Sequence, residues 1–127
     1  MGAKNIIAWI LCVLLGLFFI GGAGFAKLSP SDEMVDNFRQ WGYEPWFATF
    51  TGVIEILGGL LLLIPAAASY GGLVIAGVMV GAVYTHISTG IGSPVFPGVL
   101  LIAALVCCYL RLNRAFGPLG ALAGRSQ

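Results

Sequence analysis

Charged side chains are scarce in this sequence. Asp, Glu, Lys and Arg together make up 9% of the 127 residues, whereas 59% of the residues are hydrophobic. A soluble globular domain carries about 25% charged residues, so the composition excludes an ordinary water-soluble domain. The formal net charge of +1 provides no electrostatic basis for binding nucleic acid. The sequence therefore predicts a membrane protein in contact with the lipid bilayer.

Residues that bind metals or form disulfides are also few. The chain has one histidine and three cysteines, and Cys12, Cys107 and Cys108 all fall inside apolar runs without a CxxC or Cys/His spacing. Neighbouring residues point about 100° apart on a helix and make a strained disulfide, so apolar filler is favoured over a redox pair. We expect no metal site, no haem or iron–sulfur ligand set and no nucleophile–base motif.

Four long apolar runs account for most of the chain. A membrane helix needs about 20 mostly apolar residues, and the runs cover residues 6–26, 46–64, 67–87 and 95–112. Short connections with Gly and Pro predict antiparallel neighbours. The predicted fold class is therefore all-α. We expect a single transmembrane domain over residues 1–127, folded as a left-handed up-down four-helix bundle with a polar tail at residues 113–127.

The first apolar run has a second interpretation. Lys4 before an apolar stretch, and small residues that end at Ala26, resemble a secretory signal cleaved after Ala26. The run is longer than the about 7 to 15 apolar residues of such a signal, which favours a membrane span. Cleavage would leave three spans, with the two termini on opposite sides of the membrane.

The basic residues predict an orientation, because positively charged flanks of membrane helices stay in the cytoplasm. With four spans, one group of basic residues lies on the same side of the membrane: Lys4, Arg111, Arg114 and Arg125. Lys27 and Arg39 lie on the other side and share their loop with four acidic residues. We expect a multi-pass protein of a bacterial inner membrane with both termini in the cytoplasm and residues 28–45 outside.

The loop after the first run contains the one stretch with the polarity of a surface. Ser29 can cap a helix over about residues 30–41. Met34, Phe38 and Trp41 share one face of this helix. The pattern predicts a short amphipathic helix on the outer membrane surface, between spans 1 and 2. These three residues are candidates for a surface that binds a partner or for a lid over a pocket.

Glycine is abundant, with 19 residues. Between membrane helices, small residues let backbones approach closely. Gly52 and Gly59 lie on or near the face of Glu55, and Gly77 and Gly81 form a Gly-x-x-x-Gly pair in the third run. We expect all of them to pack helices tightly, and Gly52 and Gly59 are also candidates for contact with a ligand.

Glu55 is a carboxylate inside the second apolar run. A charge at the centre of a span costs about 2.5 to 3.5 kcal/mol on insertion scales, so such residues tend to be paired, neutralised or functional. The up-down topology places Lys27 and His86 near the outer face, about 10 to 14 Å from the depth of Glu55. One interpretation is a polar cluster that fixes the register of the bundle. The other is a ligand-binding site of Lys27, Glu55 and His86, with Glu55 as the candidate catalytic proton acceptor.

These motifs, in this order, resemble the DoxX-like family of small four-helix membrane proteins. They are GFAKL at residues 24–28, MVDNFRQWGYEP at 34–45, GVIEILGGLLLLIP at 52–65, the run ending at His86, and YLRL in the last span. The resemblance implies a membrane accessory or assembly protein that is not catalytic alone. Such a protein holds a partner protein or a lipid-like ligand in an inter-helix pocket around Glu55.

The resemblance implies further alternatives. The namesakes of the family are associated with a membrane-bound thiosulfate:quinone oxidoreductase, so the second hypothesis is a quinone-interacting subunit with quinone as the one expected cofactor. A proton or small-ion conduit is the third, although one intramembrane acid offers no relay. Several relatives carry an Arg in the first span, whereas this chain has none between Lys4 and Lys27.

Other relatives act as partners of different proteins. One sits with oxidative-stress enzymes in a membrane complex, a related type supports methylamine dehydrogenase maturation, and an animal relative assists assembly of acetylcholine receptors. The resemblance therefore implies a protein partner or a homo-oligomer.

Overall fold

The structure is a computed structural model that describes residues 2–122 and 124. Arg125 and part of the predicted tail at residues 113–127 lie outside the described residues. Within the described part, all regular elements are helices and no strand occurs. The predicted all-α class is confirmed.

Four long helical segments make up the fold. The first is a continuous helix from Ala3 to Leu28. It consists of α1 (Ala3–Leu17), the π-helix η1 (Phe18–Gly24) and α2 (Phe25–Leu28). The other three are α4 (Trp46–Leu62), α5 (Ala68–Thr89) and α6 (Val95–Leu110). Shorter helices are α3 (Asp32–Gln40), the 3-10 turn η2 (Leu112–Arg114) and α7 (Gly117–Leu122).

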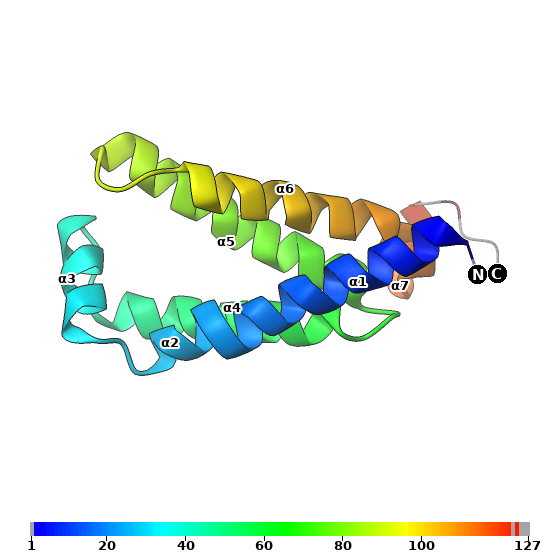
Figure 1. Cartoon of the computed structure of the whole chain (residues 1–127), viewed down its shortest axis with the longest axis horizontal. Coiled ribbons are helices and arrows are strands. Elements are labelled where there is room, and N and C mark those ends of the chain that lie inside the picture. Colours follow the sequence, from blue (N-terminus) through cyan, green and yellow to red (C-terminus); the bar gives the residue numbers. More distant parts are fainter. Residues whose placement is uncertain (1, 123, 125–127) are drawn as a thin grey trace.

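Successive long segments run in opposite directions (Figure 1). Helix α1 contacts α4 and α6, and α5 contacts both α4 and α6. The buried core lies where these four helices meet, and it includes Cys12, Leu62, Ile75 and Ala104. Toward α3 the arrangement opens, because α2 and η1 stay against α4 while the α5–α6 pair diverges from them (Figure 1). Helix α3 lies across this open end.

Glycines allow the closest approaches between helices. A Cβ atom on Gly59 of α4 would lie 2.8 Å from the carbonyl oxygen of Gly16 in α1. A Cβ atom on Gly72 of α5 would lie 2.7 Å from the carbonyl oxygen of Ala104 in α6. Such distances leave no room for a side chain, so Gly59 packs its helix tightly, as expected.

Tight packing was the wrong expectation for Gly77 and Gly81. A Cβ atom at either position would have no atom of a neighbouring helix within 4 Å. Both glycines belong to the part of α5 that has diverged from α4. Here the absence of a side chain creates space instead of a contact.

Helix α3 begins two residues later than the sequence suggests. Ser31, not Ser29, is its N-cap, and the Ser31 hydroxyl accepts a hydrogen bond from the Met34 amide at 3.2 Å. Ser29 is instead the residue that ends α2, with φ −129° and ψ 76°. Ser31 has the extended backbone that an N-cap requires, with φ −65° and ψ 162°.

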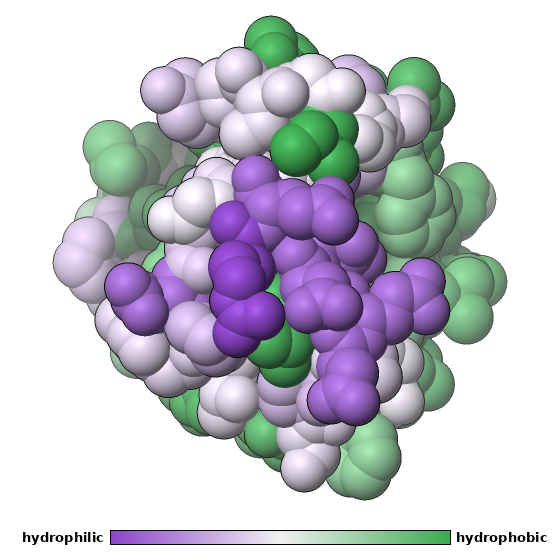
Figure 2. Space-filling model, turned by 90° about the vertical axis from the view of Figure 1, so that its left-hand side faces the viewer, coloured by the Kyte–Doolittle hydropathy of each residue, from purple (hydrophilic) through white to green (hydrophobic). Residues whose placement is uncertain are grey.

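Two segments are long and apolar enough to cross a membrane, Ala3–Leu28 and Ala68–Thr89. Helices α4 and α6 are also apolar but shorter, with 17 and 16 residues. Large hydrophobic side chains are exposed along all four segments, for example Leu14, Leu57, Val80 and Ile102. Figure 2 shows that hydrophilic residues gather on the end that carries α3, while hydrophobic residues surround them.

Candidate ligand pocket

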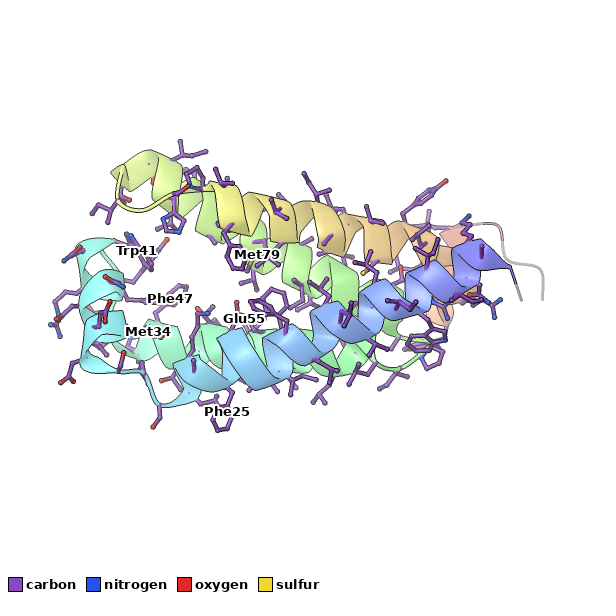
Figure 3. All side chains as sticks on the ribbon, in the orientation of Figure 1. Phe25, Met34, Trp41, Phe47, Glu55 and Met79 are labelled. Carbon is purple, nitrogen blue, oxygen red and sulfur yellow. The ribbon has the colours of Figure 1, made fainter. Side chains whose placement is uncertain are left out.

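The open end of the helix arrangement encloses a pocket of about 480 Å³. Its walls come from η1, α2, α4, α5 and α6, and residues of α3 line the pocket at the open end of the helices. Figure 3 shows Met34, Trp41, Phe47 and Met79 around the same space as Glu55, whereas Phe25 points away from it. Ligand pockets are typically about 300 to 1,000 Å³ and mostly apolar with a few polar groups. The size and lining of this pocket match those of a small-molecule site.

An ion pair between two helices forms part of the pocket wall. Lys27 of α2 donates a hydrogen bond from Nζ to Oε1 of Glu55 in α4 at 2.9 Å. The Glu55 side chain is 2% exposed and that of Lys27 is 18% exposed. Gly52 lies one turn before Glu55, and a Cβ atom there would be 2.7 Å from Cβ of Lys27. A glycine at position 52 therefore lets Lys27 lie close enough to reach Glu55.

The Lys27 ammonium group retains hydrogen-bonding capacity. An ammonium has three N–H donors. Among the described residues its acceptors are Glu55 and the carbonyl oxygen of Ala23, at 3.3 Å. One donor is therefore left for an acceptor atom in the pocket. Most of the remaining wall is apolar, so the arrangement suits an apolar ligand that carries one acceptor such as a carbonyl oxygen.

His86 lines the same pocket but does not join the ion pair. Its Nδ1 lies 2.7 Å from the carbonyl oxygen of Ile91, and its ring packs edge-on against Trp41 with centroids 5.1 Å apart. Gly92, at φ 81°, leaves the space in which the imidazole lies. The structure thus brings together Lys27 and Glu55, and it places His86 at the rim.

Helix α3 presents its apolar face to the pocket. Met34, Phe38 and Trp41 all line the pocket, and Phe38 is 7% exposed. Two hydrogen bonds hold this region against α5 and the loop after it. Trp41 donates from Nε1 to the carbonyl oxygen of Ile91 at 3.3 Å. The Tyr43 and Thr85 hydroxyls are hydrogen-bonded at 2.5 Å.

Sequence reasoning missed several pocket residues. Tyr43 lies in a loop, where no helical period could reveal its direction. Phe18 and Ala23 both line the pocket and are five residues apart, which matches the i to i+5 pattern of the π-helix η1. π-turns occur frequently at functional sites, but the FFIGGAG stretch shows no signal that distinguishes it from an ordinary apolar helix.

Gly52 and Gly59 do not line the pocket. Each lies in the contact between α4 and the first helical segment. Both glycines therefore allow the helices to pack closely, and Gly52 also lets Lys27 approach Glu55. Within the described part of the chain, no three His, Cys, Asp or Glu side chains come together in a way that could hold a metal ion.

These features define an all-α protein with an apolar outer surface and an apolar internal pocket that holds one ion pair. The chain belongs to the DoxX-like family, whose model matches residues 10–108. This match confirms the resemblance seen in the motifs. The uncharacterized protein YdgD of Bacillus subtilis (strain 168) is 29% identical over 115 residues, which cover 87% of this chain and 96% of that relative. No solved structure matches the chain.

Proposed function

We propose that this protein is an integral membrane accessory protein that holds a lipid-like molecule in the pocket beside Lys27 and Glu55. The observation that carries the proposal is a cavity of about 480 Å³ with an ion pair in an otherwise largely apolar wall. An accessory role fits because the described pocket residues include no nucleophile–base pair. The bound molecule would be used by, or delivered to, a partner protein.

The exposed apolar surface supports a four-helix bundle embedded in the membrane. Outward-facing side chains such as Ile7, Leu57 and Ile102 are 55% to 64% exposed and would face water in a soluble protein. At 1.5 Å per residue, the first segment and α5 are about 39 and 33 Å long, and α4 and α6 are about 26 and 24 Å long. A hydrocarbon core is about 30 Å thick, and a bilayer thins locally around shorter helices.

The distribution of charge supports an orientation. Acidic residues of α3 and its flanks lie at one end of the molecule, and Lys4, Arg111 and Arg114 lie on segments at the other (Figure 1). The positive-inside rule then places Ala3 and α7 on the cytoplasmic side of an inner membrane, and the pocket opens toward the outer side.

A quinone is the second candidate for the ligand. A quinone carries carbonyl oxygens on an apolar ring, and the spare Lys27 donor beside aromatic pocket walls suits such a group. In this hypothesis the protein is a subunit of an oxidoreductase. When the oxidoreductase supplies electrons to the quinone, Lys27 would donate a proton to the reduced quinone oxygen, and Glu55, 2.9 Å from the ammonium, would return a proton to Lys27. In the reverse direction, quinol oxidation, Glu55 would be the proton acceptor.

Filling the pocket tests the proposal. Gly81→Leu and Gly77→Leu add a bulky side chain at positions that line the pocket and have open space around a Cβ atom, so the fold should be retained. Gly98→Leu is the matched control, because Gly98 also has no neighbour within 4 Å but does not line the pocket. Native mass spectrometry of gently extracted protein should show a small-molecule adduct on the wild type and on Gly98→Leu, and none on the pocket variants.

The adduct mass and a further variant separate the two ligands. An adduct with a quinone mass, together with loss of quinone reduction in Glu55→Gln membranes, would favour the oxidoreductase subunit. A lipid mass, with binding weakened by Lys27→Met, would favour the lipid-like ligand. An adduct that persists unchanged in Gly81→Leu would refute binding in this pocket.

A further inference from the structure

A buried arginine lies far from the pocket, at the opposite end of the molecule. This end carries α7 and the start of α1 (Figure 1). Arg111 follows the last residue of α6 and is 2% exposed. Its Nη1 donates to Oδ1 of Asn5 at 2.6 Å, and its guanidinium carbon lies 4.9 Å from the ring centroid of Trp9. Its Nε is buried and has no hydrogen-bond partner. The groups that hold this cation are thus neutral.

No carboxylate among the described residues compensates the charge of Arg111. All five Asp and Glu residues of the chain lie between residues 32 and 55. The ion pairs found in the described part of the chain join Lys27 to Glu55 and Arg39 to Asp36. Segments next to Arg111 add positive charge, because Lys4 and Arg114 are exposed there. A buried charge is costly unless it is paired and hydrogen-bonded.

A structural role explains part of this arrangement. A cation at the C-terminal end of a helix is favoured by the helix dipole, and stacking on Trp9 adds a cation–π contact. Neither effect gives Nε a partner or neutralises the charge. An arginine with a free donor beside two exposed cations is the arrangement that binds phosphate groups.

We propose that Arg111, with Lys4 and Arg114, binds the phosphate of an anionic phospholipid headgroup in the cytoplasmic leaflet. The inference rests on the membrane orientation given under the proposed function, and it does not depend on what occupies the pocket. Lys and Arg residues at the cytoplasmic ends of membrane helices attract anionic headgroups. Trp9 and Tyr109, whose ring lies 5.9 Å from Nζ of Lys4, are suited to the interfacial depth of such a site.

The first experiment compares lipids on the wild-type chain. The full-length protein in dodecyl maltoside is heated with phosphatidylglycerol, with phosphatidylcholine of the same acyl chains, or with sodium phosphate alone. We expect phosphatidylglycerol to raise the melting temperature by several degrees more than either of the others. Equal effects of the two lipids would overturn the proposal. An equal effect of phosphate alone would assign the site to inorganic phosphate and overturn the lipid assignment.

The second experiment supplies the missing carboxylate from the protein. Asn5→Asp places a negative charge where Oδ1 already lies 2.6 Å from Arg111. This variant should melt at a higher temperature than the wild type without lipid, and the advantage of phosphatidylglycerol over phosphatidylcholine should fall by at least half. Arg111→Gln should lose the same advantage, whereas the control Arg39→Gln at the opposite end should keep it.

The two variants keep the proposal testable if one does not fold. A poorly folded Arg111→Gln leaves Asn5→Asp as the decisive variant. Full retention of the phosphatidylglycerol advantage in Asn5→Asp would overturn the inference. The adduct in the pocket serves as an independent readout, because neither substitution touches the pocket, and its loss or retention reports only on the proposed function.

Discussion

Glu55 can occupy the interior because Lys27 meets it there. The carboxylate is almost fully enclosed, and Lys27 is the one hydrogen-bond partner that the described residues provide for it. Taking two charges out of water costs free energy that their attraction only partly repays. The pair therefore contributes a polar group to the pocket without adding much to stability.

A double-mutant cycle tests this view of the pair. Lys27→Met leaves a buried, unpaired carboxylate and should lower the free energy of unfolding by about 3 to 5 kcal/mol. Adding Glu55→Leu should recover most of that loss, since a buried ion pair replaced by apolar residues is often neutral. Unfolding with increasing SDS in mixed micelles measures both effects.

The control is the other ion pair of the described chain, Arg39 with Asp36. Both side chains are 64% exposed. Removing either of them should change the free energy of unfolding by about 1 kcal/mol or less. A double variant at Lys27 and Glu55 that is as unstable as Lys27→Met would show that the charges themselves stabilise the fold.

At the scale of the helices, glycines act in two opposite ways. Gly59→Ala pushes a methyl group against the Gly16 carbonyl oxygen and should destabilise the protein by about 1 to 3 kcal/mol. Gly77→Ala meets no neighbour within 4 Å and improves helix propensity, so it should be neutral or stabilise by up to about 1 kcal/mol. Thermal unfolding in one detergent compares the two, and equal destabilisation would contradict the assignment of Gly77 to open space.

Helix α3 lines the pocket, and we propose that it acts as a lid that is held in part by the hydrogen bond between the Tyr43 and Thr85 hydroxyls. Tyr43→Phe removes the hydrogen bond but keeps the ring, so we expect faster amide hydrogen exchange in residues 32–43 and faster release of the pocket ligand. Thr85 retains its bond to the Gly81 carbonyl oxygen at 2.8 Å, which should leave α5 unchanged.

Tyr84→Phe is the matched control for the lid. Tyr84 is adjacent to Thr85 on α5 but is 68% exposed and does not line the pocket. In the Tyr84→Phe variant, amide hydrogen exchange in residues 32–43 should equal that of the wild type. If Tyr43→Phe also behaves like the wild type, the lid is held by its apolar contacts and not by the hydroxyl pair.

The sequence allowed the helices to be anticipated from local patterns, and the Lys27–Glu55 contact from the up-down order of those helices. Apolar runs define helices, and a lone acid in such a run requires a partner. The role of Gly77 and the position of His86 could not be anticipated in this way. They depend on how far α5 diverges from α4 and on the loop around Ile91, which are set by packing between distant segments. The π-helix η1 also has no local pattern that separates it from an α-helix.

At the scale of the whole molecule, the number of membrane crossings decides the orientation of the pocket. The first segment and α5 are long enough to cross by themselves. Helices α4 and α6 are several ångströms shorter than an average hydrocarbon core, at about 26 and 24 Å. Each packs along a longer neighbour, α4 against α5 and α6 against α5. This packing favours four crossings, with thinning of the bilayer around the shorter helices.

Cysteine labelling with a membrane-impermeant maleimide tests the four crossings. Background labelling should be low, because Cys12 and Cys107 are fully buried and Cys108 is partly buried. Gln40→Cys in the last turn of α3 and Ser93→Cys in the loop between α5 and α6, both at exposed positions, should react in intact spheroplasts. Ala66→Cys and Arg114→Cys, at exposed positions at the other end, should react only after the membrane is permeabilised.

The pairs of positions report on individual helices. Gln40 and Ala66 flank α4, so labelling of both in intact spheroplasts would mean that α4 does not cross. Ser93 and Arg114 flank α6 and test it in the same way. If all four assignments hold, Lys27 and Glu55 lie in the outer half of the membrane with the pocket opening to the outside. A ligand would then arrive from the outer leaflet or from a partner on the outer side, and the basic end around Arg111 would remain at the inner surface.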